Sequence, residues 1–121
     1  MYWIERDSEK VPAERTIHDG DGNIRTRAYF EGISRLPVRF QTWELDPGVS
    51  EGSHAHGGDH PLEEAYYFLE GRGTMWVDEE EVSVGAGDAV FVSPDADRGF
   101  RNTGDAPLKL IIIWGKPDER A

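Results

Sequence analysis

The chain is 121 residues long, the size of one compact domain, and 37% of its residues are hydrophobic. It contains no cysteine, which excludes disulfides and thiolate metal sites. Thirteen basic and twenty-four acidic residues give a net charge of −11. This charge argues against nucleic-acid binding, because that function needs a basic face to neutralise phosphates.

The first residues lack the basic start and apolar run of a secretory signal peptide. The longest apolar stretch, residues 110–114, is far too short to cross a membrane. We therefore expect a cytoplasmic protein with no membrane partner, built as a single domain over residues 1–121.

Helical periodicity is nearly absent, and glycine and proline interrupt the chain throughout. Short runs of β-branched and aromatic residues are instead bounded by turn residues. In chain order these predicted strands are residues 24–30, 38–45, 64–69, 74–77, 81–84, 89–92, 98–102 and 108–114. Many short strands at regular spacing are typical of an all-β sandwich or barrel. The acidic run 78–81 should form a solvated hairpin turn, and the aromatic residues of 1–10 should lie across a barrel edge or a partner.

Two histidines carry the strongest chemical signal. His54 and His56 are two residues apart in a glycine-rich segment. If that segment is extended, both side chains point to one face, with Cα atoms about 6.6 Å apart. In the strand that follows, Glu64, Tyr66 and Phe68 share a face by alternation. A carboxylate beside aromatic rings needs a partner, and a metal held by both imidazoles would supply one. Two histidines and one carboxylate suit Fe(II), and also Zn, Mn or Ni.

These residues resemble the cupin family. The chain has a pattern that resembles the first cupin motif, formed by Gly48, His54, His56, Glu64 and Gly71. A second pattern resembles the second cupin motif and is formed by Gly87, Asp88, Pro94 and Asn102. The resemblance implies a small all-β cupin barrel (a double-stranded β-helix, or jelly roll) with a core over about residues 38–114. It also implies one divalent transition metal inside the barrel mouth and a homodimer, whose interface the N-terminal aromatic residues and the last strand could supply.

The chain departs from the motif in the gap before the glutamate. Seven residues separate His56 from Glu64, more than the family usually has. We interpret the excess as a lengthened loop at the barrel mouth. His60 lies in that loop, where it is an exposed turn residue, an additional metal ligand, or the true second histidine of the motif, three residues before Glu64.

The second departure is that Arg98 occupies the position where the family has its third histidine. A guanidinium is always protonated and cannot bind a metal. Strand alternation places Arg98, Phe100 and Asn102 on one face. One interpretation is that Arg98 clamps the carboxylate or phosphate of a substrate over the metal. Another is an ion pair with Asp95, Asp97 or Glu64, the last of which would leave no metal site.

His18, the remaining histidine, is expected at the surface, although an N-terminal strand could bring it to the site. The resulting hypothesis is a metal-dependent enzyme that acts on a small anionic metabolite. His54, His56 and Glu64, with His60 as an addition, would hold the metal. The substrate would contact four side chains, Arg98, Trp43, Phe68 and Phe100.

Oxygenase chemistry is preferred, because two histidines and one carboxylate form a complete ligand set. A Zn- or Mn-type isomerase, cyclase or lyase is the alternative, with Tyr66 and Arg98 as catalytic residues. A non-catalytic barrel that binds a small molecule or a metal is the alternative from another class.

Overall fold

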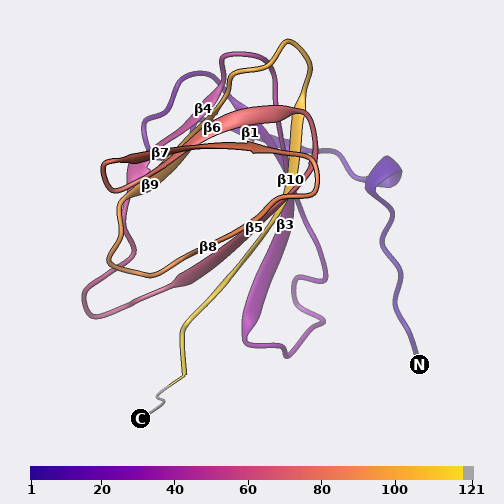
Figure 1. Cartoon of the computed structure of the whole chain (residues 1–121). Helices are drawn as coiled ribbons and strands as arrows, with labels where there is room; N and C mark the ends of the chain where they lie inside the picture. Colours follow the sequence, from indigo (N-terminus) through magenta and orange to yellow (C-terminus); the bar gives the residue numbers. More distant parts are fainter. Residues whose placement is uncertain (119–121) are drawn as a thin grey trace.

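The computed structural model describes residues 1–118, and Figure 1 shows how their strands are arranged. These residues form ten β-strands, one 3₁₀ helix η1 (Asp7–Glu9) and no α-helix. The strands are β1 (Ala13–Arg15), β2 (Ile24–Ala28), β3 (Val38–Leu45), β4 (Ser50–His54), β5 (Glu63–Glu70), β6 (Arg72–Val77), β7 (Glu80–Gly85), β8 (Ala89–Val92), β9 (Arg98–Asn102) and β10 (Leu108–Gly115). The predicted all-β class is confirmed. Each predicted strand has a counterpart, while β1 and β4 were not predicted.

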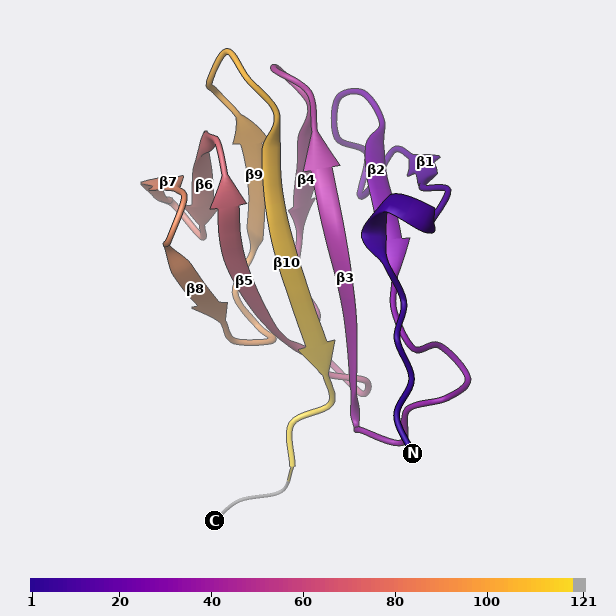
Figure 2. The same ribbon diagram turned by 90° about the vertical axis from the view of Figure 1, so that its right-hand side faces the viewer.

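The strands form two antiparallel sheets. One has the order β1-β2-β3-β10-β5-β8, and the other has the order β4-β9-β6-β7. The sheets face each other and enclose the hydrophobic core (Figures 1 and 2). The buried apolar side chains of that core are Ile24, Trp43, Leu45, Tyr66, Phe68, Met75, Val84, Val92, Phe100, Leu108, Leu110 and Ile112.

Alternation along β5 places the predicted site residues inside the barrel. Glu64, Tyr66 and Phe68 are buried, whereas the intervening Tyr67 is 46% exposed. The strand is paired on both sides, with β10 and with β8. Glu64 therefore projects from the six-stranded sheet toward the space between the sheets.

A β-bulge in β4 turns two polar side chains inward. Glu51 pairs with Phe100 of β9 and His54 pairs with Arg98, so two residues of β4 stand opposite Gly99 alone. Strict alternation would place residues three apart on opposite faces, and one extra residue restores them to the same face. Glu51 and His54 consequently both face the interior.

The segment after β1 is bound to β4 through its backbone. The amide of Gly52 donates to the carbonyl of Ile17 at 3.1 Å, and the amide of Ser50 donates to Asp21 at 2.9 Å. A Cβ atom at Gly52 would overlap the carbonyl oxygen of His18, so only glycine allows this approach. His18 has a φ of 53° and lies in the left-handed region, which non-glycine residues seldom adopt without a local constraint.

The N-terminal segment crosses the outer face of the six-stranded sheet, as Figure 2 shows beside β2 and β3. Its anchor is Asp7, which accepts hydrogen bonds from Tyr29 at 2.6 Å and from Lys109 at 3.2 Å. The predicted acidic turn is found between β6 and β7, where Asp78 and Glu79 form the turn. Over residues 1–118, no helix has the length and hydropathy needed to cross a bilayer.

Candidate metal centre

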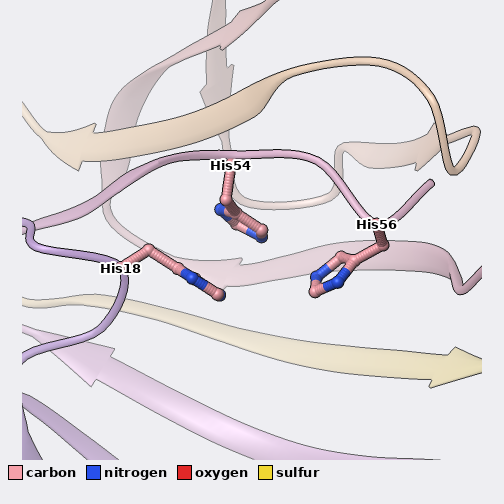
Figure 3. A group of neighbouring side chains, drawn as sticks. All are labelled: His18, His54 and His56. Atoms are coloured by element: carbon pink, nitrogen blue, oxygen red, sulfur yellow. The ribbon is translucent and has the colours of Figure 1, made fainter. Parts of the chain in front are cut away.

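Three histidines from two separate segments meet at one end of the space between the sheets. His18 follows β1, His54 ends β4, and His56 lies two residues further on. One ring nitrogen of each lies within 4.8 Å of the others, and Figure 3 shows the three rings turned toward one another. His18 is exposed, as predicted for a surface residue, yet its ring stacks on His54 with centroids 3.5 Å apart. The N-terminal segment therefore brings a third imidazole to the site.

The hydrogen bonding of His54 prepares one nitrogen for a metal. Its Nδ1 lies 2.9 Å from the carbonyl oxygen of Gly52. A carbonyl can only accept, so Nδ1 donates this bond, and in the neutral ring Nε2 is the nitrogen that carries the lone pair. That Nε2 is buried and has no hydrogen-bond partner among residues 1–118. A ring fixed by a backbone carbonyl on one nitrogen and open on the other is the usual state of a metal-binding histidine.

The electrostatics of the cluster favour neutral imidazoles. Burial lowers the pKa of His18 and of His56, and the neighbouring imidazoles lower both further. Both rings are therefore neutral near pH 7, the state that binds metal. Two nitrogens that share one ion at about 2.1 Å can be at most about 4.2 Å apart. The cluster is slightly wider than this, and the rings of His18 and His54 are stacked, so the rings would have to turn for their nitrogens to share an ion.

Glu64 lies against the cluster but is already engaged. Its Oε1 accepts a hydrogen bond from Tyr66 at 2.9 Å and another from Arg98 Nη1 at 3.1 Å. The same oxygen lies 3.4 Å from His56 Nε2 and 3.6 Å from His54 Nε2. Burial alone would raise the pKa of Glu64, but these neighbours outweigh it and the pKa is lowered. Glu64 is therefore an ionised carboxylate beside the imidazoles.

Arg98 is fully buried and paired with protein groups. Besides Glu64, its guanidinium donates to the carbonyl of Ser93, while Nε has no partner among residues 1–118. The structure thus contains the Glu64–Arg98 ion pair that was one of the alternatives predicted for this arginine. The prediction that this pair removes the metal site assumed only two histidines. With His18 present, three imidazoles stand free of the pair.

A cavity of about 370 Å³ adjoins the cluster. Its lining consists of Arg15, Thr16, Ile17, His18, Gln41, Trp43, Glu51, His56, Leu62, Glu64, Ile112 and Trp114. Of the predicted substrate contacts, Trp43 lines this cavity, whereas Phe68 and Phe100 are fully buried core residues outside its lining.

Tyr66, the predicted acid or base, is 1% exposed and also lies outside the cavity lining. Burial raises its pKa, and the carboxylates of Glu51 and Glu64 raise it further. The phenol therefore stays protonated, and its hydroxyl is committed to Glu64.

The loop between His56 and Glu64 is the lengthened loop that the spacing predicted. It closes on itself, because the amide of Leu62 donates to the carbonyl of His56 at 3.0 Å. His60 is exposed in the turn of this loop, and the three-histidine cluster does not include it.

Glu51 is a site residue that the sequence analysis missed. It is completely buried, and neither carboxyl oxygen has a hydrogen-bond partner among residues 1–118. Burial raises its pKa well above the usual range, and the charge of Glu64 adds to the shift. No sequence signal marks Glu51, because only the bulge in β4 turns it inward.

The model of the Cupin_2 family, described as a cupin domain, matches residues 41–114. The chain belongs to this family. The barrel of two antiparallel sheets and the histidines at its mouth are thus features of a small cupin.

Curated relatives and solved structures agree with this assignment. An oxalate-binding protein of Thermotoga maritima is 27% identical over 91% of each chain. A crystal structure described as a predicted oxalate decarboxylase from the same organism has a TM-score of 0.85 and 27% identity. It covers 95% of this cupin and 100% of that chain. A Cupin 2 barrel protein from Salinispora arenicola has a TM-score of 0.75 and 21% identity, with coverage of 96% and 89%, and shows the shared fold.

An uncharacterised protein of Methanocaldococcus jannaschii is 43% identical over 64 residues. That match covers 53% of this cupin and 49% of the relative, so the chain spans about half of the relative's length.

Proposed function

We propose that this cupin holds one divalent transition metal on His18, His54 and His56 and acts on a small carboxylate bound beside it. The observation that carries the proposal is the clustering of three histidine rings around the buried Nε2 of His54, which has no hydrogen-bond partner among residues 1–118. A bound divalent ion would supply Lewis-acid stabilisation of carboxylate oxygens. The relatives described as oxalate-binding and as a predicted oxalate decarboxylase support a small carboxylate as the ligand.

The environment of Glu64 bears on the type of reaction. Glu64 Oε1 already accepts two hydrogen bonds, so the three imidazoles are the first candidates as ligands. Lyase or decarboxylase chemistry on a bound carboxylate is the first candidate reaction, and the relative described as a predicted oxalate decarboxylase supports it. An oxygenase is the second candidate, because the Glu64 carboxylate lies within 3.6 Å of both His54 and His56 and could complete a two-histidine, one-carboxylate set.

Metal titration tests the proposal. We expect the metal-free protein to take up about one equivalent of Mn²⁺, Fe²⁺, Ni²⁺ or Zn²⁺ in calorimetry. His18→Ala should lower the affinity at least about tenfold, because a ligand is lost. His60→Ala is the matched control and should leave the affinity unchanged. Uptake below about a tenth of an equivalent by the wild type would overturn the proposal.

A product assay then separates catalysis from binding. The metal-loaded protein is incubated with oxalate, anaerobically and in air, and products are followed by NMR. Formation of formate and CO₂ without net consumption of O₂ supports decarboxylase chemistry, and stoichiometric consumption of O₂ supports the oxygenase. Binding of oxalate without turnover would assign the protein to the non-catalytic class.

We also propose that the protein is a homodimer. The outer face of the six-stranded sheet carries exposed apolar side chains near the outermost strand, β8. They are Tyr67, Phe91 and Ile113. The strand register sets Phe91 and Ile113 on either side of Ala65. A second copy that covers this face would bury them, since contiguous apolar patches are typical of interaction sites.

A further inference from the structure

The side chain predicted to hold the anionic group of a ligand does not reach the cavity. Arg98 is fully buried, pairs with Glu64 and Ser93, and is not part of the cavity lining. The acidic side chains of Glu51 and Glu64 do line the cavity. An anionic ligand would therefore meet the ionised carboxylate of Glu64 at the barrel interior, and its anionic group needs donors elsewhere on the wall.

Arg15 provides a free cation at the cavity wall. It is the last residue of β1, lines the cavity and is exposed. Within residues 1–118 its guanidinium makes no ion pair or hydrogen bond. A guanidinium carries five N–H donors in a planar fork and matches the two oxygens of a carboxylate. The group is therefore available to a bound anion.

Gln41 of β3 presents donors to the same cavity. The indole of Trp43 donates to Gln41 Oε1 at 2.8 Å. Because an indole N–H can only donate, this bond fixes the amide so that its oxygen is occupied and its NH₂ group is the free end. Gln41 and Arg15 line both this cavity and a second one of about 400 Å³, so the two residues stand where the cavities adjoin.

These two donors line the same cavity as two of the imidazoles, those of His18 and His56. β1 and β3 belong to the six-stranded sheet, whereas His54 ends β4 in the other sheet. The cavity lining thus offers N–H donors from Arg15 and Gln41, and ring nitrogens suited to a metal from His18 and His56. A ligand that satisfies both groups needs an anionic group at each end.

We propose that Arg15 and Gln41 form an anion subsite, and that the ligand is a small dicarboxylate with one carboxylate on this subsite. The inference rests on the proposed function in that the second carboxylate would lie toward the histidines. It adds the residues that select the ligand, none of which lies in a cupin motif.

Malonate binding to substituted proteins tests the subsite. Gln41→Glu keeps an oxygen for Trp43 but replaces the NH₂ donors with an anionic oxygen. Arg15→Ala removes the guanidinium, and Arg35→Ala removes an exposed arginine of the loop between β2 and β3 as a charge-matched control. Calorimetry is performed on metal-free and on metal-loaded protein, with acetate as the monocarboxylate comparison and metal content measured throughout.

We expect Arg15→Ala and Gln41→Glu each to weaken malonate binding about tenfold or more, with metal content unchanged and a smaller effect on acetate binding to the metal-loaded protein. Arg35→Ala should bind malonate like the wild type, and Arg15→Lys should recover part of the affinity because it keeps the charge. Unchanged malonate affinity in Arg15→Ala and Gln41→Glu, or no malonate binding by the wild type in either form, would overturn the inference. A wild type that takes up no metal but binds malonate through Arg15 and Gln41 would uphold the inference and overturn the proposed metal function.

Discussion

Arg98→Met should destabilise the protein strongly, because it removes one partner of a buried ion pair. The methionine fills similar volume but leaves the Glu64 carboxylate, 5% exposed, without its cation and the Ser93 carbonyl without its donor. Loss of one partner from a buried pair costs about 3–5 kcal/mol. An unfolding entropy of about 2.1 cal/mol/K per residue converts this to a fall in Tm of about 12–20 °C for this chain.

Differential scanning calorimetry of metal-free protein measures this effect. The double variant Arg98→Met/Glu64→Gln removes both charges and should recover most of the loss, since an uncharged pair leaves no unpaired ion behind. Added divalent metal should stabilise Arg98→Met more than the wild type, because Glu64 is then free to meet the ion. A single variant within about 1 kcal/mol of the wild type would refute the reasoning, since the ion pair would then contribute no more than an exposed one.

Three further predictions concern other parts of the barrel. The pKa of Glu51 is raised in the folded state, so its contribution to stability is complete at acid pH and is lost as the pH rises. Glu51→Gln should therefore reduce the fall in unfolding free energy between pH 5 and pH 8, by about 1.4 kcal/mol for each unit of pKa shift that is removed. Urea unfolding at both pH values measures this, and an equal fall in the variant and the wild type would contradict the prediction. Gly52→Ala should displace the segment that carries the third imidazole and lower metal affinity about tenfold, whereas Gly85→Ala, whose added Cβ meets only ordinary contacts, should not. Light scattering should report a dimer for the wild type and a monomer for Phe91→Glu. Val82→Glu changes an exposed residue of β7 and is the control, which should remain a dimer. A monomeric wild type would exclude the dimer.

The sequence predicted most strands because their β-branched and aromatic runs are bounded by turn residues. β4 was missed because Ser50–His54 has polar and glycine residues with little strand preference. Its extended form comes from pairing with β9 and from the backbone bonds to the segment after β1. These are contacts between distant parts of the chain, which local patterns do not encode.

The site was predicted only in part, again because some of its contacts join distant parts of the chain. The spacing of His54, His56 and Glu64 predicted that they lie together, and the Glu64–Arg98 pair was one of the alternatives foreseen. His18 was expected at the surface, with an N-terminal strand that brings it to the site as the alternative, because nothing in its local sequence shows that the segment after β1 packs on Gly52. Gly20 and Gly52 both allow this close approach of two backbone segments, but the sequence does not show that the two segments lie together.

The central claim is that three imidazoles from two segments hold one metal ion. Anomalous diffraction from a metal-loaded crystal tests it most directly. We predict one anomalous peak about 2.1 Å from a ring nitrogen of each of His18, His54 and His56. No peak at this position, or a peak bound by His60 without His18, would contradict the account.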